Sequence, residues 1–130
     1  MRTPIPGTVA RGQLQEQPEF YTGMDSSGSF IASNPINSDS ELLQRGKHEF
    51  EIYCTPCHGS SGDGQGMLST IAGVRTANLH EERLREVPDG QLFDTITNGF
   101  GLMPGYRYPL HPADRWAVVA YVRQLQSQTQ

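Results

Sequence analysis

Apolar residues recur at helical spacing in two stretches of the chain, and the first runs directly into a pair of cysteines. This stretch reads SDSELLQRGKHEFEIYC at 38 to 54, where Ser and Asp residues suited to cap a helix precede the apolar positions. One face of the predicted helix carries its larger apolar residues and a glycine, namely Leu43, Gly46, Phe50 and Tyr53. A buried glycine costs a helix about 1 kcal/mol relative to alanine. Its presence on this face indicates that another helix crosses closely at Gly46.

The second periodic stretch is ADRWAVVAYVRQLQ at 113 to 126. Trp116, Val119 and Ala120 fall on one helical face, and further apolar residues flank them on both sides. Such a wide apolar surface predicts a helix buried in the core.

Between these stretches the sequence predicts two shorter helices. Residues 80–87, HEERLREV, form one that Pro88 ends, and Asp89 is expected to cap a second helix, GQLFDTITN, which Gly99 closes. No alternating strand pattern of useful length occurs, so the predicted fold class is all-α, with three to five helices and long loops. Loops of this length argue against a compact helical domain unless they enclose something. We therefore expect them to surround a cofactor.

The chain divides into three parts by its composition and its helical periodicity. Residues 1–37 mix Pro, Gly and Ser without a helical period and predict an extended arm, residues 38–126 form the predicted domain, and residues 127–130 are a short tail. The arm is either a flexible tail or a segment that lies on a surface of its own domain or of a partner. Spaced apolar residues favour the surface: Phe20, Tyr21, Phe30 and Ile31.

Composition narrows the class of protein. Only 35% of residues are hydrophobic, while 14 Gly and 9 Pro exceed ordinary usage, so a bound prosthetic group would help to stabilise the fold. The formal net charge of −4 gives no basic footprint for nucleic acid. The sequence has no apolar run long enough to span a membrane, and its opening MRTPIPGTVARG lacks the hydrophobic region of a secretion signal.

The two cysteines stand in CTPCHG at 54 to 59, and three chemistries use such a pair. A redox dithiol needs a strand that meets a helix, which this sequence does not predict. Structural zinc needs four ligands, and the remaining histidines have no zinc-ligand spacing. The third is haem c, attached by thioethers from Cys54 and Cys57, with His58 as an axial ligand of the iron. The motif C-x-x-C-H favours haem.

A six-coordinate iron needs a second ligand from the other face of the haem. Met103 is the best candidate, because it lies in the turn G-L-M-P-G, where Pro104 stiffens the chain and the glycines allow close approach. The alternatives are Met67, which follows His58 too closely to reach the opposite face, and His80 or His111, which suit surface or loop positions. Met103 itself is otherwise a methionine that fills a gap in the core.

These motifs together resemble class I cytochrome c: G-K-x-x-F-x-x-x-C-x-x-C-H at 46 to 58, M-P at 103 to 104, and R-W-x-x-x-x-Y-V-R at 115 to 123. The resemblance covers about two-thirds of the chain and implies that the N-terminal helix crosses the C-terminal helix through Gly46, Phe50 and Tyr121. Many members have a proline whose carbonyl accepts the ring N–H of the axial histidine. This chain reads GVRTANL there, without proline, so the acceptor for His58 is not apparent from the sequence.

A narrower resemblance includes the arm. GTVARGQLQEQPEFYTG at 7 to 23, EIYCTPCHG, DTITNGFGLMPGY and DRWAVVAYVRQLQ are similar to the mono-haem cytochrome subunit of bacterial alternative complex III, a quinol-oxidising respiratory complex. This resemblance implies electron transfer by one haem c, no catalysis by the chain itself, partners among other respiratory subunits and redox proteins, and a position on the periplasmic side of the membrane. The alternatives are a stand-alone periplasmic shuttle, a cytochrome domain serving a terminal oxidase, and a haem enzyme or gas sensor with an open iron site.

Overall fold

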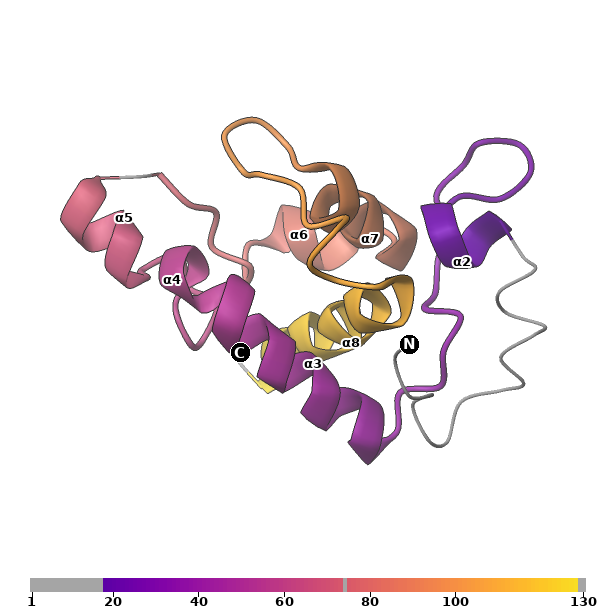
Figure 1. The fold of residues 1–130 in the computed structure, drawn as a ribbon, viewed down its shortest axis with the longest axis horizontal. Helices are drawn as coiled ribbons and strands as arrows, with labels where there is room; N and C mark the ends of the chain where they lie inside the picture. Colours follow the sequence, from indigo (N-terminus) through magenta and orange to yellow (C-terminus); the bar gives the residue numbers. More distant parts are fainter. Residues whose placement is uncertain (1–17, 74, 129–130) are drawn as a thin grey trace.

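The computed structural model describes residues 18–73 and 75–128, and within them the protein is all-α, as predicted. β structure in these ranges is limited to two isolated bridges, Met24 with Phe30 and Phe100 with Met103. Three helices have ten residues or more, whereas the others have four to six and serve as turns between them (Figure 1). The helices are α2 (Pro18–Thr22), α3 (Ser40–Tyr53), α4 (Thr55–His58), α5 (Met67–Ala72), α6 (Glu82–Glu86), α7 (Asp89–Asn98) and α8 (Pro112–Gln128).

Helix α3 begins where its capping residues predict and buries nearly the expected face. The Asp39 carboxylate accepts a hydrogen bond from the Leu42 backbone N–H at 2.9 Å, which satisfies one of the free donors of the first turn. Leu42 is fully buried and Leu43 only partly, so the sequence assigned the wrong one of two adjacent leucines to the core. Gly46 and Phe50 are buried as expected.

Helices α3 and α8 cross at Gly46, which confirms the contact that the sequence implied. A Cβ atom at Gly46 would lie 2.0 Å from the Ala117 carbonyl oxygen, so only glycine lets the two backbones approach this closely. The rings of Phe50 and Tyr121 meet edge to face beside this point, with their centroids 5.3 Å apart. The crossing brings the C-terminal end of α3, and therefore the cysteines, against the core.

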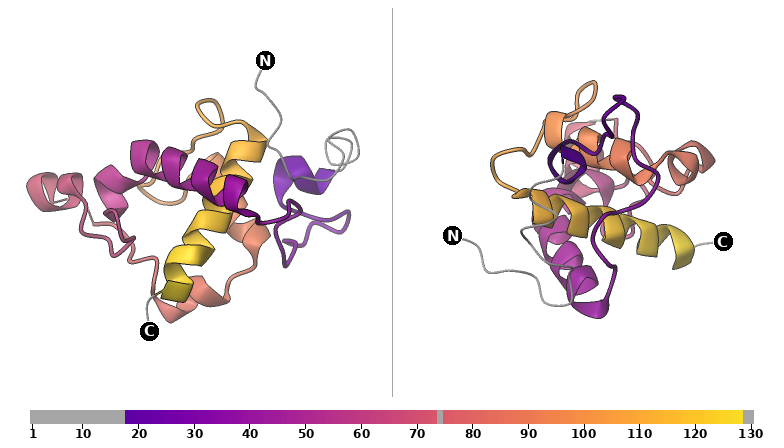
Figure 2. Two further views of the ribbon diagram at one scale, coloured as in Figure 1. Left: turned by 90° about the horizontal axis from the view of Figure 1, so that it is seen from below. Right: turned by 90° about the vertical axis from the view of Figure 1, so that its right-hand side faces the viewer.

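Helix α8 forms the centre of the molecule. All its residues from Asp114 to Val122 are buried, and the Trp116 ring stacks on the Phe93 ring of α7 at 4.1 Å between centroids. Figures 1 and 2 show α8 enclosed by α3 on one side and by α6 and α7 on the other. Such burial explains why apolar residues surround this helix instead of following a single stripe.

The described part of the arm, residues 18–37, packs against its own domain, and it contains a helix that the sequence did not predict. Helix α2 is short, and it forms because Phe20 is buried and the Trp116 Nε1–H donates to the Phe20 carbonyl at 2.8 Å. Asn34 Nδ2 donates to the Trp116 carbonyl at 2.8 Å. Tertiary contacts therefore order a segment whose own sequence has no helical period. Residues 1–17 lie outside the described residues.

The predicted boundaries after residues 37 and 126 stay predictions. Residues 18–37 and the domain share one core, which includes Phe20 and Ile36. Helix α8 continues to Gln128, two residues into the segment expected to be a tail.

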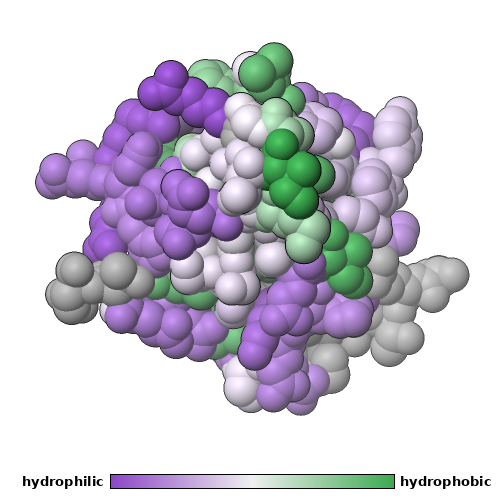
Figure 3. Space-filling view, turned by 90° about the vertical axis from the view of Figure 1, so that its left-hand side faces the viewer, coloured by the Kyte–Doolittle hydropathy of each residue, from purple (hydrophilic) through white to green (hydrophobic). Residues whose placement is uncertain are grey.

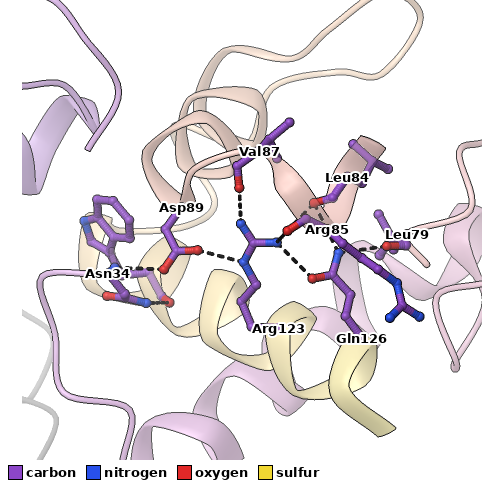
Figure 4. Close-up of polar contacts among 9 residues, drawn as sticks. Asn34, Leu79, Leu84, Arg85, Val87, Asp89, Arg123 and Gln126 are labelled. Carbon is purple, nitrogen blue, oxygen red and sulfur yellow. Dashed lines mark hydrogen bonds and ion pairs between the residues drawn. The ribbon is translucent and has the colours of Figure 1, made fainter. Parts of the chain in front are cut away.

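Asp89 does not cap α7 as the sequence predicted. The cap position is Pro88, and the Asp89 carboxylate instead accepts from the Asn34 backbone N–H at 2.8 Å and from Arg123 Nε at 2.7 Å (Figure 4). The aspartate thus joins the arm, α7 and α8 at one point. The sequence predicts only a local role for Asp89, because both partners are distant along the chain.

Candidate functional site

The cysteine motif forms the short helix α4 at the end of α3. Cys54 connects the two helices, with its backbone N–H donating to Phe50 and its carbonyl accepting from His58 at 2.8 Å. Cys57 also donates to the Cys54 carbonyl, at 3.2 Å. One helical turn therefore holds both thiols and the imidazole as a compact unit.

The glycine-rich loop that follows folds back on this turn. Gly64 donates its backbone N–H to the His58 carbonyl at 2.7 Å, and Gly66 donates to the Cys57 carbonyl at 3.1 Å. A Cβ atom at Gly66 would lie 2.4 Å from the Pro56 carbonyl oxygen, so the loop could not pass here with any other residue. The sequence of this loop matches neither a phosphate-binding nor a calcium-binding motif. The loop instead fixes the backbone of the cysteine turn.

The structure supplies the acceptor for the His58 ring that the sequence left open. His58 Nδ1 lies 3.1 Å from the Ala77 carbonyl oxygen, within the GVRTANL segment. Burial lowers the pKa of His58, and the bond to Ala77 partly offsets that shift. The ring is therefore neutral at physiological pH, with Nδ1–H donating and Nε2 free to bind a metal.

Burial raises the pKa of the Cys54 thiol to about 12, and the neighbouring Cys57 adds to the shift. A redox dithiol attacks through a thiolate at physiological pH, so Cys54 is unsuited to be the attacking thiol of such a pair. The described residues contain no cluster of three or more His, Cys, Asp or Glu side chains that could hold a metal ion.

The loop from Gly99 to Leu110 carries Met103 and lies across from α4. Its ends are fastened by backbone and side-chain bonds: Tyr106 donates its N–H to the Ile96 carbonyl at 2.7 Å, and Arg115 Nε donates to the Leu110 carbonyl at 3.0 Å. Gly99 lets the loop close on the Met103 carbonyl and Gly105 lets it pass the Thr97 carbonyl of α7, because a Cβ on either glycine would lie within 2.6 Å of that oxygen.

One cavity of about 280 Å³ lies between these elements, and Cys54, Cys57, His58 and Met103 all line it. The alternatives for the second ligand do not. Met67 is 70% exposed on α5, the His80 ring bonds to the Ser61 carbonyl, and the His111 carbonyl accepts from the first turn of α8. The described residues thus bring together the four predicted site residues and leave the other candidates outside.

The cavity fits a haem. Most of its lining is apolar, as a porphyrin face requires, and it includes Phe50, Leu79, Leu84, Val87, Leu92, Ile96, Val118 and Val122. The two thiols and His58 lie on one helical turn, and the thioether sulfur of Met103 is a further donor of a kind that binds haem iron.

Sequence reasoning missed several residues that build this site. Ala77 binds the His58 ring through its backbone, so its side chain carries no signal. Arg115 belongs to the R-W motif, but the motif does not indicate its partners. Arg115 donates to the Leu110 carbonyl and, at 2.7 Å, to Thr97 Oγ1, and both bonds depend on the tertiary fold. Arg75 and Arg83 line the cavity and were not singled out.

Solved structures share this fold at low sequence identity. The reducing HAO-like protein complex of Kuenenia stuttgartiensis contains a similar chain, with a TM-score of 0.62 and 19% identity over 75% of this chain and 49% of that one. Cytochrome cL from Methylophaga aminisulfidivorans gives a TM-score of 0.55 and 22% identity over 82% of this chain and 61% of the other. Both likenesses support the class I cytochrome c fold.

A curated relative matches a shorter region. The dehydrogenase subunit of the quinone-dependent alcohol dehydrogenase of Acetobacter aceti is 29% identical over 48 residues, which are 37% of this chain and 6% of that protein. The chain therefore spans only a small part of this relative.

The family model described as cytochrome c oxidase, cbb3-type, subunit III matches residues 41–122, a range that includes the cysteine turn, the Met103 loop and most of α8. That match implies covalently bound haem c and haem-based electron transfer. The chain belongs to this cytochrome c family.

Proposed function

We propose that this chain carries electrons on a single haem c, attached to Cys54 and Cys57 and ligated by His58 and Met103. The observation that carries the proposal is that all four residues line the same cavity. His58 supports it further, because its bond to Ala77 engages Nδ1 and leaves Nε2 available to bind a metal. Bound haem would supply an iron centre that exchanges one electron.

Two filled axial positions suit an electron carrier, since the iron then changes charge with little rearrangement, whereas catalysis or gas sensing needs an open position. The fastened ends of the Met103 loop favour the carrier. His–Met ligation also raises the reduction potential relative to a bis-histidine site.

The contact face for redox partners is proposed to surround the Met103 loop and the turn at Thr55 and Pro56. Phe100, Leu102 and Tyr108 on this loop are 77%, 90% and 91% exposed. Figure 3, which views the side of α4 and α5, shows apolar residues among strongly polar ones on that face. Apolar contact with a polar rim suits brief encounters.

The narrower proposal is that the chain is a subunit of a quinol-oxidising respiratory complex on the periplasmic side of the membrane. The similarity of residues 7–23 to the alternative complex III subunit supports it, as does a relative that is itself a subunit of a quinone-dependent dehydrogenase. Among the described helices, none is long and apolar enough to cross a membrane.

Carbon monoxide tests the ligation. The reduced native protein is expected not to bind it, because both axial positions are filled. Met103→Ala should open the site and bind carbon monoxide, whereas Met67→Ala, a matched change on exposed α5, should behave as the native protein. Ready binding by the native protein would contradict the carrier role.

A truncation tests the complex. Residues 18–37 pack into the core, so removing them would damage the domain, and the informative deletion ends at residue 17. The shortened protein is expected to keep its haem spectrum and to lose co-purification with respiratory membrane subunits. Unchanged assembly would mean that residues 1–17 are not what holds the chain in the complex, whereas a full-length protein that co-purifies with no membrane subunit would favour the stand-alone shuttle.

A further inference from the structure

We propose that His80 is a positioning residue for His58. Its ring fixes the segment whose Ala77 carbonyl accepts from the His58 ring, and it thereby sets how strongly His58 binds haem iron. This inference rests on the proposed function, because it assumes that His58 Nε2 is an axial ligand. The sequence suggests only ligand or loop roles for His80, and its side chain does not line the cavity.

The first observation is that His80 joins two segments beside His58. Its ring Nε2 lies 2.7 Å from the Ser61 carbonyl oxygen, and the adjacent Leu79 N–H donates to the Gly62 carbonyl, also at 2.7 Å. A carbonyl only accepts hydrogen bonds, so His80 Nε2 carries the ring proton and donates it. Two consecutive residues of one segment are therefore bonded to two consecutive residues of the glycine-rich loop.

The second observation is that the same two segments hold His58 from both sides. Gly64 in the loop donates its N–H to the His58 carbonyl at 2.7 Å, and the Ala77 carbonyl oxygen lies 3.1 Å from His58 Nδ1. A Cβ atom at Gly64 would lie 2.8 Å from the Thr76 carbonyl oxygen and 3.2 Å from that of Ala77, so the loop and the segment are in contact here. His80 thus closes a circuit of hydrogen bonds that fixes both the backbone and the ring of His58.

The third observation is a tight turn between Ala77 and His80. Asn78 follows Ala77, and its Oδ1 accepts from the His80 backbone N–H at 2.9 Å. The Asn78 carbonyl accepts from the Glu81 N–H at 3.1 Å. An asparagine side chain that bonds to the backbone two residues later restricts the chain to a compact turn. The position of His80 therefore determines where the Ala77 carbonyl lies.

The rest of the domain anchors the backbone of this turn. Gln126 Nε2 of α8 donates to the Leu79 carbonyl at 2.8 Å (Figure 4), and Arg85 Nε of α6 donates to the His80 carbonyl at 2.8 Å. The His80 ring thus extends from a fixed backbone to the glycine-rich loop. Loss of the ring bond alone would release the loop at one point and leave these anchoring bonds in place.

The fourth observation is that His80 Nδ1 is buried and has no hydrogen-bond partner among the described residues. An unpaired buried polar atom costs about as much free energy as one hydrogen bond contributes, or more. The ring therefore adds little net stability to the fold. Its main effect is to hold the loop in place beside His58.

The consequence for the electron carrier concerns the basicity of His58. An Nδ1–H that donates to a carbonyl makes Nε2 a stronger ligand, which favours the oxidised iron. If the Ala77 carbonyl moves away, this effect weakens and the reduction potential rises. General loosening of the fold would instead admit water, which favours the more highly charged oxidised iron and lowers the potential. The sign of the change therefore separates positioning from a merely structural role.

The test is potentiometry of the holoprotein, together with the exchange rate of the His58 ring N–H in the reduced state, measured by proton NMR. His80→Leu removes the donor and is expected to raise the potential and to speed the exchange. His80→Gln is expected to match the native protein, because its amide donates to Ser61 from nearly the place of Nε2. His111→Leu is the matched control: His111 is exposed before α8, so both readouts should stay native.

An unchanged or lower potential in His80→Leu, or a rise that His80→Gln does not reverse, would overturn the proposal. If His80→Leu yields no holoprotein, His80→Asn takes its place, because its shorter amide ends before the Ser61 carbonyl. A raised potential in His80→Asn with a native potential in His80→Gln would then support the proposal, and any other result would overturn it.

The covalent haem content of the native protein is measured first. Absence of haem there would contradict the proposed function. Haem whose potential does not respond to the changes at His80 would contradict only the positioning role.

Discussion

The two walls of the cavity are built by different means. The His58 wall is fixed by short-range backbone bonds, with Gly64 donating to the His58 carbonyl and Gly66 to the Cys57 carbonyl. The Met103 wall is a loop held mainly at its ends, by Tyr106 and by Arg115. The first wall therefore depends on the fit of a glycine-rich turn, and the second on a backbone bond to α7 and on the Arg115 side chain of α8. Changes in one wall should leave the other intact.

The largest effect is expected from Gly66→Ala on the His58 wall. The new Cβ would lie 2.4 to 2.6 Å from backbone atoms of residues 55–57, which cannot shift without moving the cysteine turn. Overpacking of this kind costs about 3 kcal/mol. We expect low haem attachment and a lower melting temperature of the holoprotein.

Gly73→Ala is the control for this change. Gly73 has a φ of 69° but nothing lies within 4 Å of its Cβ position, so the variant suffers only local backbone strain, of about 1 to 2 kcal/mol. Haem attachment should be normal. If Gly73→Ala and Gly66→Ala lost haem equally, the close fit of the loop on the cysteine turn would not explain the His58 wall.

Arg115→Gln should loosen the Met103 wall alone. Arg115 is buried and bonds to the Leu110 carbonyl at 3.0 Å and to Thr97 Oγ1 at 2.7 Å, and a hydrogen bond from a charged group contributes about 1.5 to 3 kcal/mol. The variant is expected to keep its covalent haem, to unfold at lower denaturant concentration, and to bind carbon monoxide slowly when reduced.

Arg107→Gln serves as the matched variant, because Arg107 is exposed on the same loop and bonds only to Asn98 among the described residues. Its unfolding midpoint should stay close to that of the native protein. Equal losses in both variants would show that positive charge near the loop, and not the buried bonds of Arg115, holds this wall.

Gly105→Ala sharpens the same comparison with a smaller and more local change. A Cβ at Gly105 would lie 2.6 Å from the Thr97 carbonyl oxygen, so the loop must shift where it passes the end of α7. We expect a cost of about 1 to 3 kcal/mol and a weakened Met103 ligand, seen as a lower reduction potential. If less haem were attached and the remaining holoprotein had a normal potential, the two walls would not be independent.

Tyr106→Phe should have the smallest effect. The Tyr106 hydroxyl donates to the Tyr53 carbonyl over 3.3 Å, and the ring itself keeps its contact with Tyr53 at 5.7 Å between centroids. Loss of one such bond costs about 0.5 to 1.5 kcal/mol. The unfolding midpoint should fall slightly while the haem spectrum is unchanged, and an altered spectrum would assign the hydroxyl a role at the ligand itself.

The parts of the fold that follow from local patterns were predictable. The helices at α3 and α8, the crossing at Gly46, and the cysteine motif all rest on spacing within a few residues. Met103 was identifiable because its turn combines glycines with a proline. Its place on the cavity agrees with that reasoning, while its role as a ligand stays a prediction.

Features that depend on distant partners were not predictable. Helix α2 forms because the Trp116 ring N–H donates to its backbone. Asp89 does not cap α7 and instead accepts hydrogen bonds from Arg123 and from Asn34 in the arm. Ala77 contributes only a carbonyl, which any residue would provide. In each case the stabilising contact joins segments that are far apart in sequence, so no local sequence pattern predicts it.

The central claim is that one haem is bound covalently by both cysteines, and an intact mass measurement tests it most directly. The protein, matured in a host with a cytochrome c assembly system, should gain the mass of one haem and keep it in acidified organic solvent. A peptide that contains residues 48–75 should carry that mass. An unmodified chain, or haem that extracts into the solvent, would contradict the account.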